Sequence, residues 1–113
     1  MSNQPITIKN IFQLPVGLAN QEIFEEIIST ENIKLERIIS TGQITPSGEW
    51  YDQETDEWVI LLQGTACLGY EDGREISLNT GDYLLIPAHQ KHRVTYTSSE
   101  PPCVWLAIHS KLK

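Results

Sequence analysis

Three side chains of this 113-residue sequence have types and spacing that could support chemistry: Glu57, His89 and His92. Glu57 directly precedes a purely apolar run, residues 58–62, that is closed by Gly64. A carboxylate at the start of a buried strand is costly unless it is paired, hydrogen-bonded, protonated or bound to a metal. Histidine is the commonest metal ligand and a ready general base. A glutamate and a histidine from separate strands could therefore converge on one cavity.

Strand alternation extends this candidate site to the residues before Glu57. In an extended chain Tyr51, Gln53 and Glu57 have the same parity, so they face one side if no bulge intervenes. Gln53 could give its carbonyl oxygen to a metal or hydrogen-bond a ligand, and Tyr51 is more typical of a pocket wall. Two interpretations stay open: a functional site around Glu57 and His92, or a structural pair inside the fold.

Arg37 and His89 are candidates for contacts with a substrate. Arg37 has the parity of Leu35 and Ile39, so it could point inward and bind an anion through its guanidinium group. A surface salt bridge is the alternative. The turn geometry at His89 aims its side chain at the mouth of the cavity, although exposure to solvent is its default. We expect no role for His109, which lies near the C-terminus.

The strands that must position these residues begin at Ile33. Alternation and turn signals predict six short strands, at residues 33–40, 57–63, 65–71, 81–88, 92–98 and 103–110. Residues 71–75 contain an Asp–Gly pair, which is the strongest short hairpin signal. Successive short strands separated by turns predict an all-β fold, either a barrel or a double-sheet jelly roll.

The first 32 residues have a different pattern. Ile23, Phe24, Ile27 and Ile28 share one face of a helix, and Asn20 is a plausible N-cap. This spacing predicts a short helix at about residues 21–29, preceded by an irregular arm. We therefore expect an arm and helix over residues 1–32 and a β-barrel over residues 33–113, within a single folding unit.

Composition excludes several classes of function. Acidic residues outnumber basic ones by 15 to 8, for a net charge of −7, so a nucleic acid partner is not expected. The longest apolar run is far shorter than the ~20 residues that span a bilayer, so no membrane partner is expected. The first ten residues lack the pattern of a signal peptide, and the two cysteines are typical of reduced thiols. Together these features predict a cytoplasmic protein.

Two spaced motifs resemble those of the cupin superfamily of small β-barrels. Glu57 and Gly64 have the spacing that ends the first cupin motif, and Gly81, Pro87 and His92 match the second. The resemblance covers roughly residues 33–109. It implies a cupin-like double-stranded β-helix, a homodimer, and a pocket for a small-molecule ligand that can hold a divalent metal ion.

The departures from the cupin pattern affect the expected metal ligands. Tyr51 and Gln53 stand where many cupins have two histidines, and His89 stands where they usually have glycine. Glu57 and His92 are the two ligands that remain of four. The resemblance thus implies either a metal-assisted oxygenase, isomerase or lyase, or a metal-free binding or sensing module. The interpretation we favour is a small-molecule pocket protein with a weak metal site formed by Gln53, Glu57 and His92.

Overall fold

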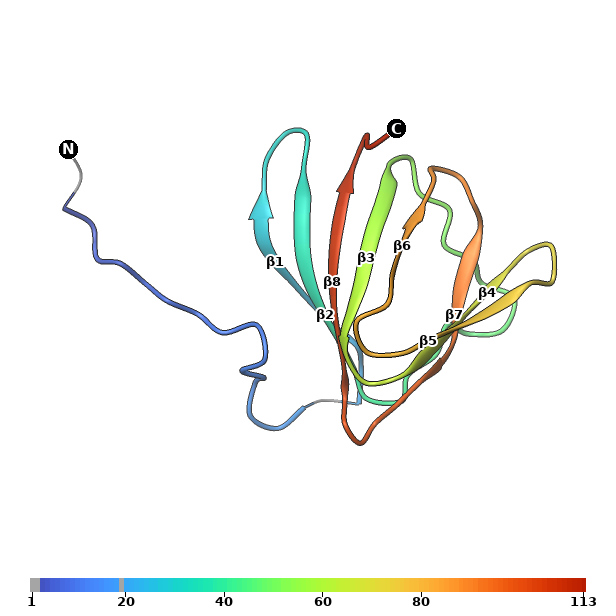
Figure 1. Cartoon of the computed structure of the whole chain (residues 1–113), viewed down its shortest axis with the longest axis horizontal. Helices are drawn as coiled ribbons and strands as arrows, with labels where there is room; N and C mark the ends of the chain where they lie inside the picture. The colour runs from blue at the N-terminus through green and yellow to red at the C-terminus, as the bar shows by residue number, and fades with distance from the viewer. Residues whose placement is uncertain (1–2, 19) are drawn as a thin grey trace.

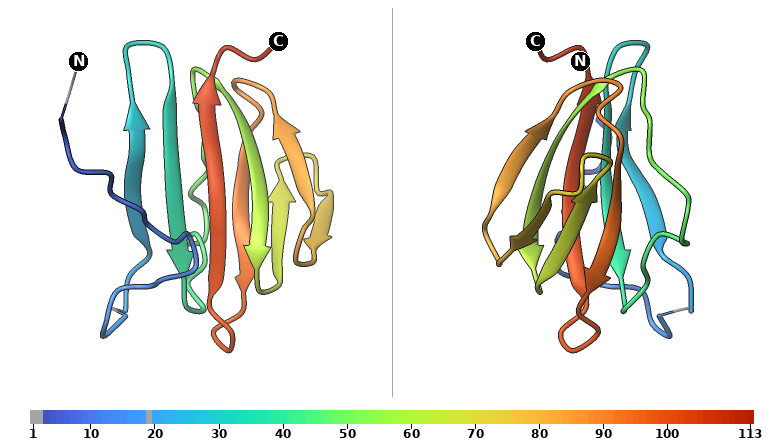
Figure 2. Two further views of the ribbon diagram at one scale, coloured as in Figure 1. Left: turned by 60° about the vertical axis from the view of Figure 1, so that its left-hand side comes forward. Right: turned by 90° about the vertical axis from the view of Figure 1, so that its right-hand side faces the viewer.

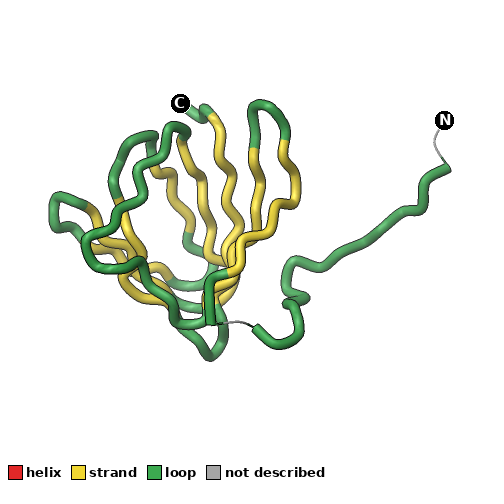
Figure 3. The backbone as a smooth tube through the Cα atoms, turned by 180° about the vertical axis from the view of Figure 1, so that it is seen from behind, coloured by secondary structure: helices red, strands yellow, loops and turns green. Residues whose placement is uncertain are grey.

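The computed structural model of the chain describes residues 3–18 and 20–113, and in these residues all regular secondary structure is β (Figure 3). The strands are β1 (Ile23–Ser29), β2 (Lys34–Ser40), β3 (Asp56–Gln63), β4 (Ala66–Tyr70), β5 (Glu75–Leu78), β6 (Tyr83–Ile86), β7 (His92–Thr97) and β8 (Cys103–Ser110). The described residues include no helix that is long and apolar enough to cross a membrane.

The eight strands form two antiparallel sheets (Figures 1 and 2). The larger sheet has the order β1-β2-β8-β3-β6, and the smaller has the order β5-β4-β7. This is the expected all-β, jelly-roll type of fold. The sheets are not closed into a barrel, so the double-sheet jelly roll is the observed one of the two expected forms.

The core lies between the two sheets. Val59 and Leu61 of β3 point inward from the larger sheet, and Leu68 of β4 meets them from the smaller one. On β3 these side chains alternate with the less buried Trp58 and Ile60, because successive residues of a strand face opposite sides. Glu57 has the parity of Val59, so the same alternation turns its carboxylate toward the interior, as the sequence predicts.

The N-terminal helix predicted over residues 21–29 is wrong, because this segment is strand β1. It pairs with β2 in antiparallel register, from Ile23 opposite Ile39 to Ser29 opposite Lys34. A β-bulge between Glu26 and Ile28 shifts the parity along the strand, and this shift produces the helix-like spacing of the apolar residues. Isoleucine and phenylalanine favour strands, and a helix this short is marginal alone, so pairing with β2 decides the outcome.

Two turns show why glycine is needed at particular positions. Gly64 closes β3 with a φ of 94°, and a Cβ atom there would lie 2.7 Å from the Ser98 hydroxyl oxygen and 2.9 Å from the Cys103 sulfur. Gly73, in the Asp–Gly hairpin between β4 and β5, has a φ of 92° but open space around it. The predicted hairpin is thus confirmed, and Gly64 is fixed by packing as well as by backbone conformation.

Asp56 ties the C-terminal residues to the start of β3. Its carboxylate accepts hydrogen bonds from the main-chain amides of Ala88, Leu112 and Lys113, at 2.8, 2.8 and 3.0 Å. These bonds, that of Ala88 above all, lower the pKa of Asp56. One side chain therefore fixes both the loop before β7 and the end of the chain.

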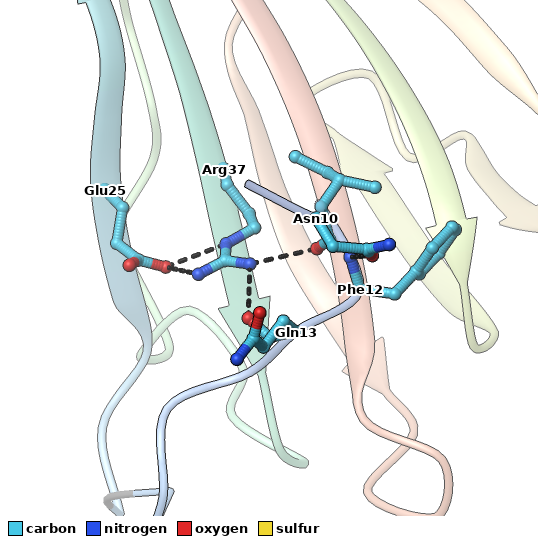
Figure 4. Close-up of polar contacts among 6 residues, drawn as sticks. Asn10, Phe12, Gln13, Glu25 and Arg37 are labelled. Carbon is cyan, nitrogen blue, oxygen red and sulfur yellow. Dashed lines mark hydrogen bonds and ion pairs between the residues drawn. The ribbon is translucent and has the colours of Figure 1, made fainter. Parts of the chain in front are cut away.

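The arm before β1 runs away from the sheets, and Arg37 anchors its residues 11–13 (Figures 1 and 4). Arg37 donates hydrogen bonds to the main-chain oxygens of Ile11 and Gln13 and to the carboxylate of Glu25. The boundary expected at residue 33 stays a prediction, and β1, which precedes that boundary, belongs to the same sheet as β2.

Candidate functional site

A cavity of about 70 Å³ lies between the two sheets and is lined from both. Its carboxyl groups are Glu22, Glu36 and Glu57, and its imidazoles are His92 and His109. Tyr51, Gln53, Phe24 and Trp105 complete the polar and aromatic part of the wall, and the remainder is aliphatic. The sequence-predicted residues Tyr51, Gln53, Glu57 and His92 thus line one cavity.

Glu57 and His92 face each other across the gap between the sheets. Glu57 begins the inward row of β3, and His92 is the first residue of β7 in the other sheet. They are 7% and 5% exposed, and Glu57 Oε1 lies 3.8 Å from His92 Nε2. This distance is an ion-pair contact but too long for a hydrogen bond. The other ring nitrogen of His92, Nδ1, lies 2.9 Å from the carbonyl oxygen of Gln90. Because a carbonyl only accepts, Nδ1 carries hydrogen, and in the neutral ring Nε2 is then an acceptor.

Tyr51 and Gln53 are held beside His92 by main-chain hydrogen bonds. Tyr51 and His92 form an isolated antiparallel bridge, with N···O distances of 2.7 and 3.2 Å. The amide of His89 donates to the carbonyl of Gln53 at 2.8 Å. The Tyr51 ring stacks on the His92 imidazole, with centroids 5.5 Å apart. A short extended segment outside the main strands therefore completes the cavity wall.

Glu36 and His109 form a second pair in the same cavity, which sequence reasoning missed. His109 Nε2 lies 2.8 Å from Glu36 Oε1, and Lys34 Nζ lies 3.7 Å from Glu36 Oε2. His109 stands directly opposite Glu57 in the pairing of β8 with β3. The parity of Glu36 with Ile38, and of His109 with Trp105, was the available signal. Proximity to the C-terminus was a poor guide, since β8 is a central strand of the larger sheet.

The carboxyl groups of the cavity differ in their proton affinity. Burial raises the pKa of Glu57, and the nearby His109 and His92 offset this only in part. Burial also raises the pKa of Glu22, although Glu22 accepts a 2.9 Å hydrogen bond from the Ser40 hydroxyl. The hydrogen bond with His109 lowers the pKa of Glu36. Glu57 and Glu22 therefore hold their protons more tightly than free carboxyl groups do, and Glu36 holds its proton less tightly.

Arg37 and His89 lie outside the cavity. The inward orientation considered for Arg37 is not observed: its guanidinium is on the other face of β2, bound to Glu25 and to the arm (Figure 4). The inward residues of β2 are Glu36 and Ile38. His89 has a φ of 64° and a side chain that is 66% exposed, and its Nδ1 lies 2.8 Å from Asp52. Neither residue lines the cavity in the structure.

The donor set does not match the metal site that the cupin pattern implies. Glu57 and His92 supply one carboxylate and one imidazole, while Tyr51 and Gln53 occupy the positions of the other ligands. In the described part of the chain, no three His, Cys, Asp or Glu side chains are grouped closely enough to hold a metal ion. The four-ligand centre of the family is therefore not reproduced here.

An outer groove of about 600 Å³ continues from the cavity. Its wall includes Glu36, Tyr51, Gln53 and His109, which also line the cavity, and it adds Glu31, Lys34 and Glu54. A molecule larger than the cavity could thus place one end between the sheets and the remainder in this groove.

The double-sheet fold and the two motif spacings around Glu57 and His92 are those of a cupin, and the comparison with protein families agrees. The cupin-domain family matches residues 38–109, more than half of the chain, so the protein belongs to the cupin family. The predicted resemblance is confirmed. None of the curated proteins matches the chain.

Solved structures show similarity over nearly the whole chain. A protein of Ralstonia eutropha described as a "putative mannose-6-phosphate isomerase" is 42% identical, with a TM-score of 0.86 over 94% of this chain and 99% of that one. A cupin superfamily protein of Desulfitobacterium hafniense is 20% identical, with a TM-score of 0.71 over 94% and 99%. A cupin of Methanocaldococcus jannaschii with a double-stranded β-helix is 16% identical, with a TM-score of 0.69 over 93% of each chain. The last two show the fold alone.

Proposed function

We propose that this cupin binds a small organic molecule in the cavity between its sheets. The observation that carries the proposal is the meeting of Glu57 and His92, two buried polar side chains 3.8 Å apart, without a hydrogen bond between them. Buried polar groups in folded proteins nearly always have hydrogen-bond partners, so a partner supplied by a ligand accounts for this arrangement. Tyr51 and Gln53 would contribute further contacts.

The same arrangement can transfer a proton, which leaves an enzymatic role open. Glu57 has a raised pKa, and His92 presents Nε2 to the same space. Such a pair suits general acid–base chemistry on a bound molecule. The similarity to the Ralstonia protein suggests an isomerase as the enzymatic alternative. A sugar phosphate would have to leave its phosphate outside, near Lys34, because none of the described residues that line the cavity is lysine or arginine.

Methyl NMR tests ligand binding in the cavity directly. The protein would be titrated with a panel of small neutral, cationic and anionic molecules while the methyl signals of Val59, Ile86 and Val94, which line the cavity, are followed. The exposed Ile44 is a control. We expect at least one class of molecule to shift the cavity signals and leave Ile44 unchanged. If no member of the panel moves the cavity signals, the proposal is wrong.

A weak site for a divalent metal ion is a second candidate. Glu57, His92 and the Gln53 carbonyl would be its protein ligands, with water in the remaining positions. Two imidazoles fewer than in a full cupin site should make binding weak, and protons should displace the ion as pH falls. Calorimetric titration of chelator-treated protein tests this. Tight binding that survives both Glu57→Ala and His92→Ala would place the metal elsewhere.

We also propose that the protein forms a homodimer, as the cupin resemblance implies. Phe24 and Ile28 on edge strand β1 are 53% and 52% exposed, and Ile6 and Ile8 on the arm are 92% and 89% exposed. Apolar side chains gathered at a sheet edge and on a projecting arm are typical of a surface that a second copy covers. Sedimentation of the protein at micromolar concentration should show a dimer, and a monomer would contradict the proposal.

A further inference from the structure

We propose that the cavity binds the ammonium group of a small organic amine, with Glu57 as its counter-ion. This inference rests on the proposed function, because it specifies the ligand of the same cavity. Three features support it: the charges of the lining, the orientation of the acceptor atoms, and the character of the walls.

The charges that face the cavity favour a cation. Three carboxyl groups and two imidazoles line it, and none of its described lining residues is lysine or arginine. Glu36 is already paired with His109 and Lys34, and Glu22 accepts a hydrogen bond from Ser40. Glu57 is different: its side chain is only 10% exposed, and its contact with His92, at 3.8 Å, is too long for a hydrogen bond. A buried carboxylate in this situation is strongly stabilised by a cation that also donates hydrogen bonds.

The acceptor atoms converge on one point. In neutral His92, Nδ1–H donates to the Gln90 carbonyl, so Nε2 offers its lone pair toward Glu57. Two acceptors 3.8 Å apart can share one donor group, because a nitrogen about 2.8 Å from each would lie between them. An ammonium nitrogen has three N–H donors and can also reach the Gln53 carbonyl. A carboxylate or phosphate at this point would instead meet acceptors.

The walls distinguish an organic cation from a metal ion. The rings of Tyr51 and Trp105 line the cavity together with the aliphatic side chains of Val59 and Ile86. Aromatic faces attract organic cations, and aliphatic side chains pack against carbon atoms, whereas a metal ion needs oxygen, nitrogen or sulfur ligands on several sides. The cavity of about 70 Å³ accommodates a group of few heavy atoms, such as an ammonium group and the adjoining carbons.

The outer groove continues the same preference. Glu31, Glu36 and Glu54 line it, against a single lysine, Lys34. The net charge of −7 adds a field that attracts cations to the whole molecule. An amine with a polar or second cationic end could therefore extend from the cavity into the groove.

Three matched compounds test the inference: n-propylamine, 1-propanol and propionate, titrated near neutral pH with a chelator present. Binding is followed through the methyl signals of Val59, Ile86 and Val94. We expect n-propylamine to bind at least about tenfold more tightly than 1-propanol, since a hydrogen bond to a charged group is worth roughly that factor. Propionate should bind least. Equal affinities, or a preference for propionate, would overturn the inference.

Variants of Glu57 assign the preference to this residue. Glu57→Gln removes the charge with little change in shape and should abolish the advantage of the amine over the alcohol. Glu57→Asp keeps the charge and should keep part of that advantage. Glu75→Gln, at an exposed position of β5, removes the same net charge elsewhere and should have no effect. An amine preference that persists in Glu57→Gln would refute the assignment. If the alcohol or propionate shifts the cavity signals but the amine has no advantage, this inference fails while the proposed function stands.

Discussion

Replacing Glu57 by glutamine should stabilise the ligand-free protein at pH values where the carboxyl group is ionised. The folded state raises the pKa of Glu57 above its ordinary value of 4.5, because burial removes the carboxylate from water. The folded protein therefore holds this proton more tightly than the unfolded chain does. Stability associated with this group is complete below pH 4.5 and is lost as pH rises through the folded-state pKa.

The size of the effect follows from the surroundings of the carboxylate. A buried neutral acceptor without a hydrogen bond costs about 1–3 kcal/mol and a charged one costs more, and the side chain of Glu57 is only 10% exposed. Glutamine has nearly the same shape but no charge, so it avoids the additional cost of the charge. We expect Glu57→Gln to raise the free energy of unfolding by about 1–3 kcal/mol near pH 8, and by much less near pH 4.5.

Urea denaturation at both pH values measures this difference. The proteins compared are the wild type, Glu57→Gln and the exposed control Glu75→Gln. The control should match the wild type at each pH. A Glu57→Gln variant that is less stable than both near pH 8 would refute the reasoning. In that event the carboxylate has a favourable partner within the protein, such as a protonated His92, and needs no ligand.

Three other predictions concern the frame around the cavity. Gly64→Ala should lower the free energy of unfolding by roughly 2–5 kcal/mol in the denaturation assay, because positive φ and steric overlap both oppose a Cβ atom. Gly73→Ala, with positive φ but open space, should lower it by only about 1–2 kcal/mol. Equal costs for the two variants would contradict the packing argument. Asp56→Asn should lower the melting temperature near neutral pH. Because the folded pKa of Asp56 lies below 3.8, the wild type should keep its higher melting temperature until the pH falls through that lower pKa. If the difference in melting temperature persists in stronger acid, it does not come from the ionised carboxylate. Arg37→Ala should speed proteolysis within residues 10–13 without affecting ligand binding, and unchanged cleavage would show that other contacts hold the arm.

Much of the fold could be predicted from the sequence because alternation and turn chemistry are local properties. The Asp–Gly hairpin and the inward row of β3 from Glu57 needed no knowledge of the partner strands. β1 could not be predicted in this way. Its bulge shifts the alternation between Glu26 and Ile28, and the segment becomes a strand only because β2 offers it an open edge. Local spacing does not contain that information.

The site was predictable to the extent that motif spacing indicated it. Glu57 and His92 lie on different sheets, and no local pattern relates them. Only the spacing of the two cupin motifs indicated that they belong to one site. Arg37 was considered for the cavity on its parity with Leu35 and Ile39, but its guanidinium binds the arm and Glu25 on the outer face. Ile39 is buried without lining the cavity, so a buried neighbour did not mark the cavity side. His109 was overlooked because it lies near the C-terminus. Strand order, which places β8 beside β3, is a tertiary property that this position does not reveal.

The stability and binding experiments are linked through one carboxylate. If Glu57 has a structural role, its removal should destabilise the protein and should not change which small molecules bind. If it is a counter-ion for a ligand, its removal should stabilise the empty protein and abolish the preference for an amine. A group that destabilises the empty fold is expected where binding requires it, because a ligand that binds only the folded state restores stability in proportion to its occupancy. Saturating amine should therefore stabilise the wild type more near pH 8 than it stabilises Glu57→Gln. Equal stabilisation of both proteins would show that Glu57 destabilises the empty fold without contributing to amine binding. Its burial would then not be explained by ligand binding.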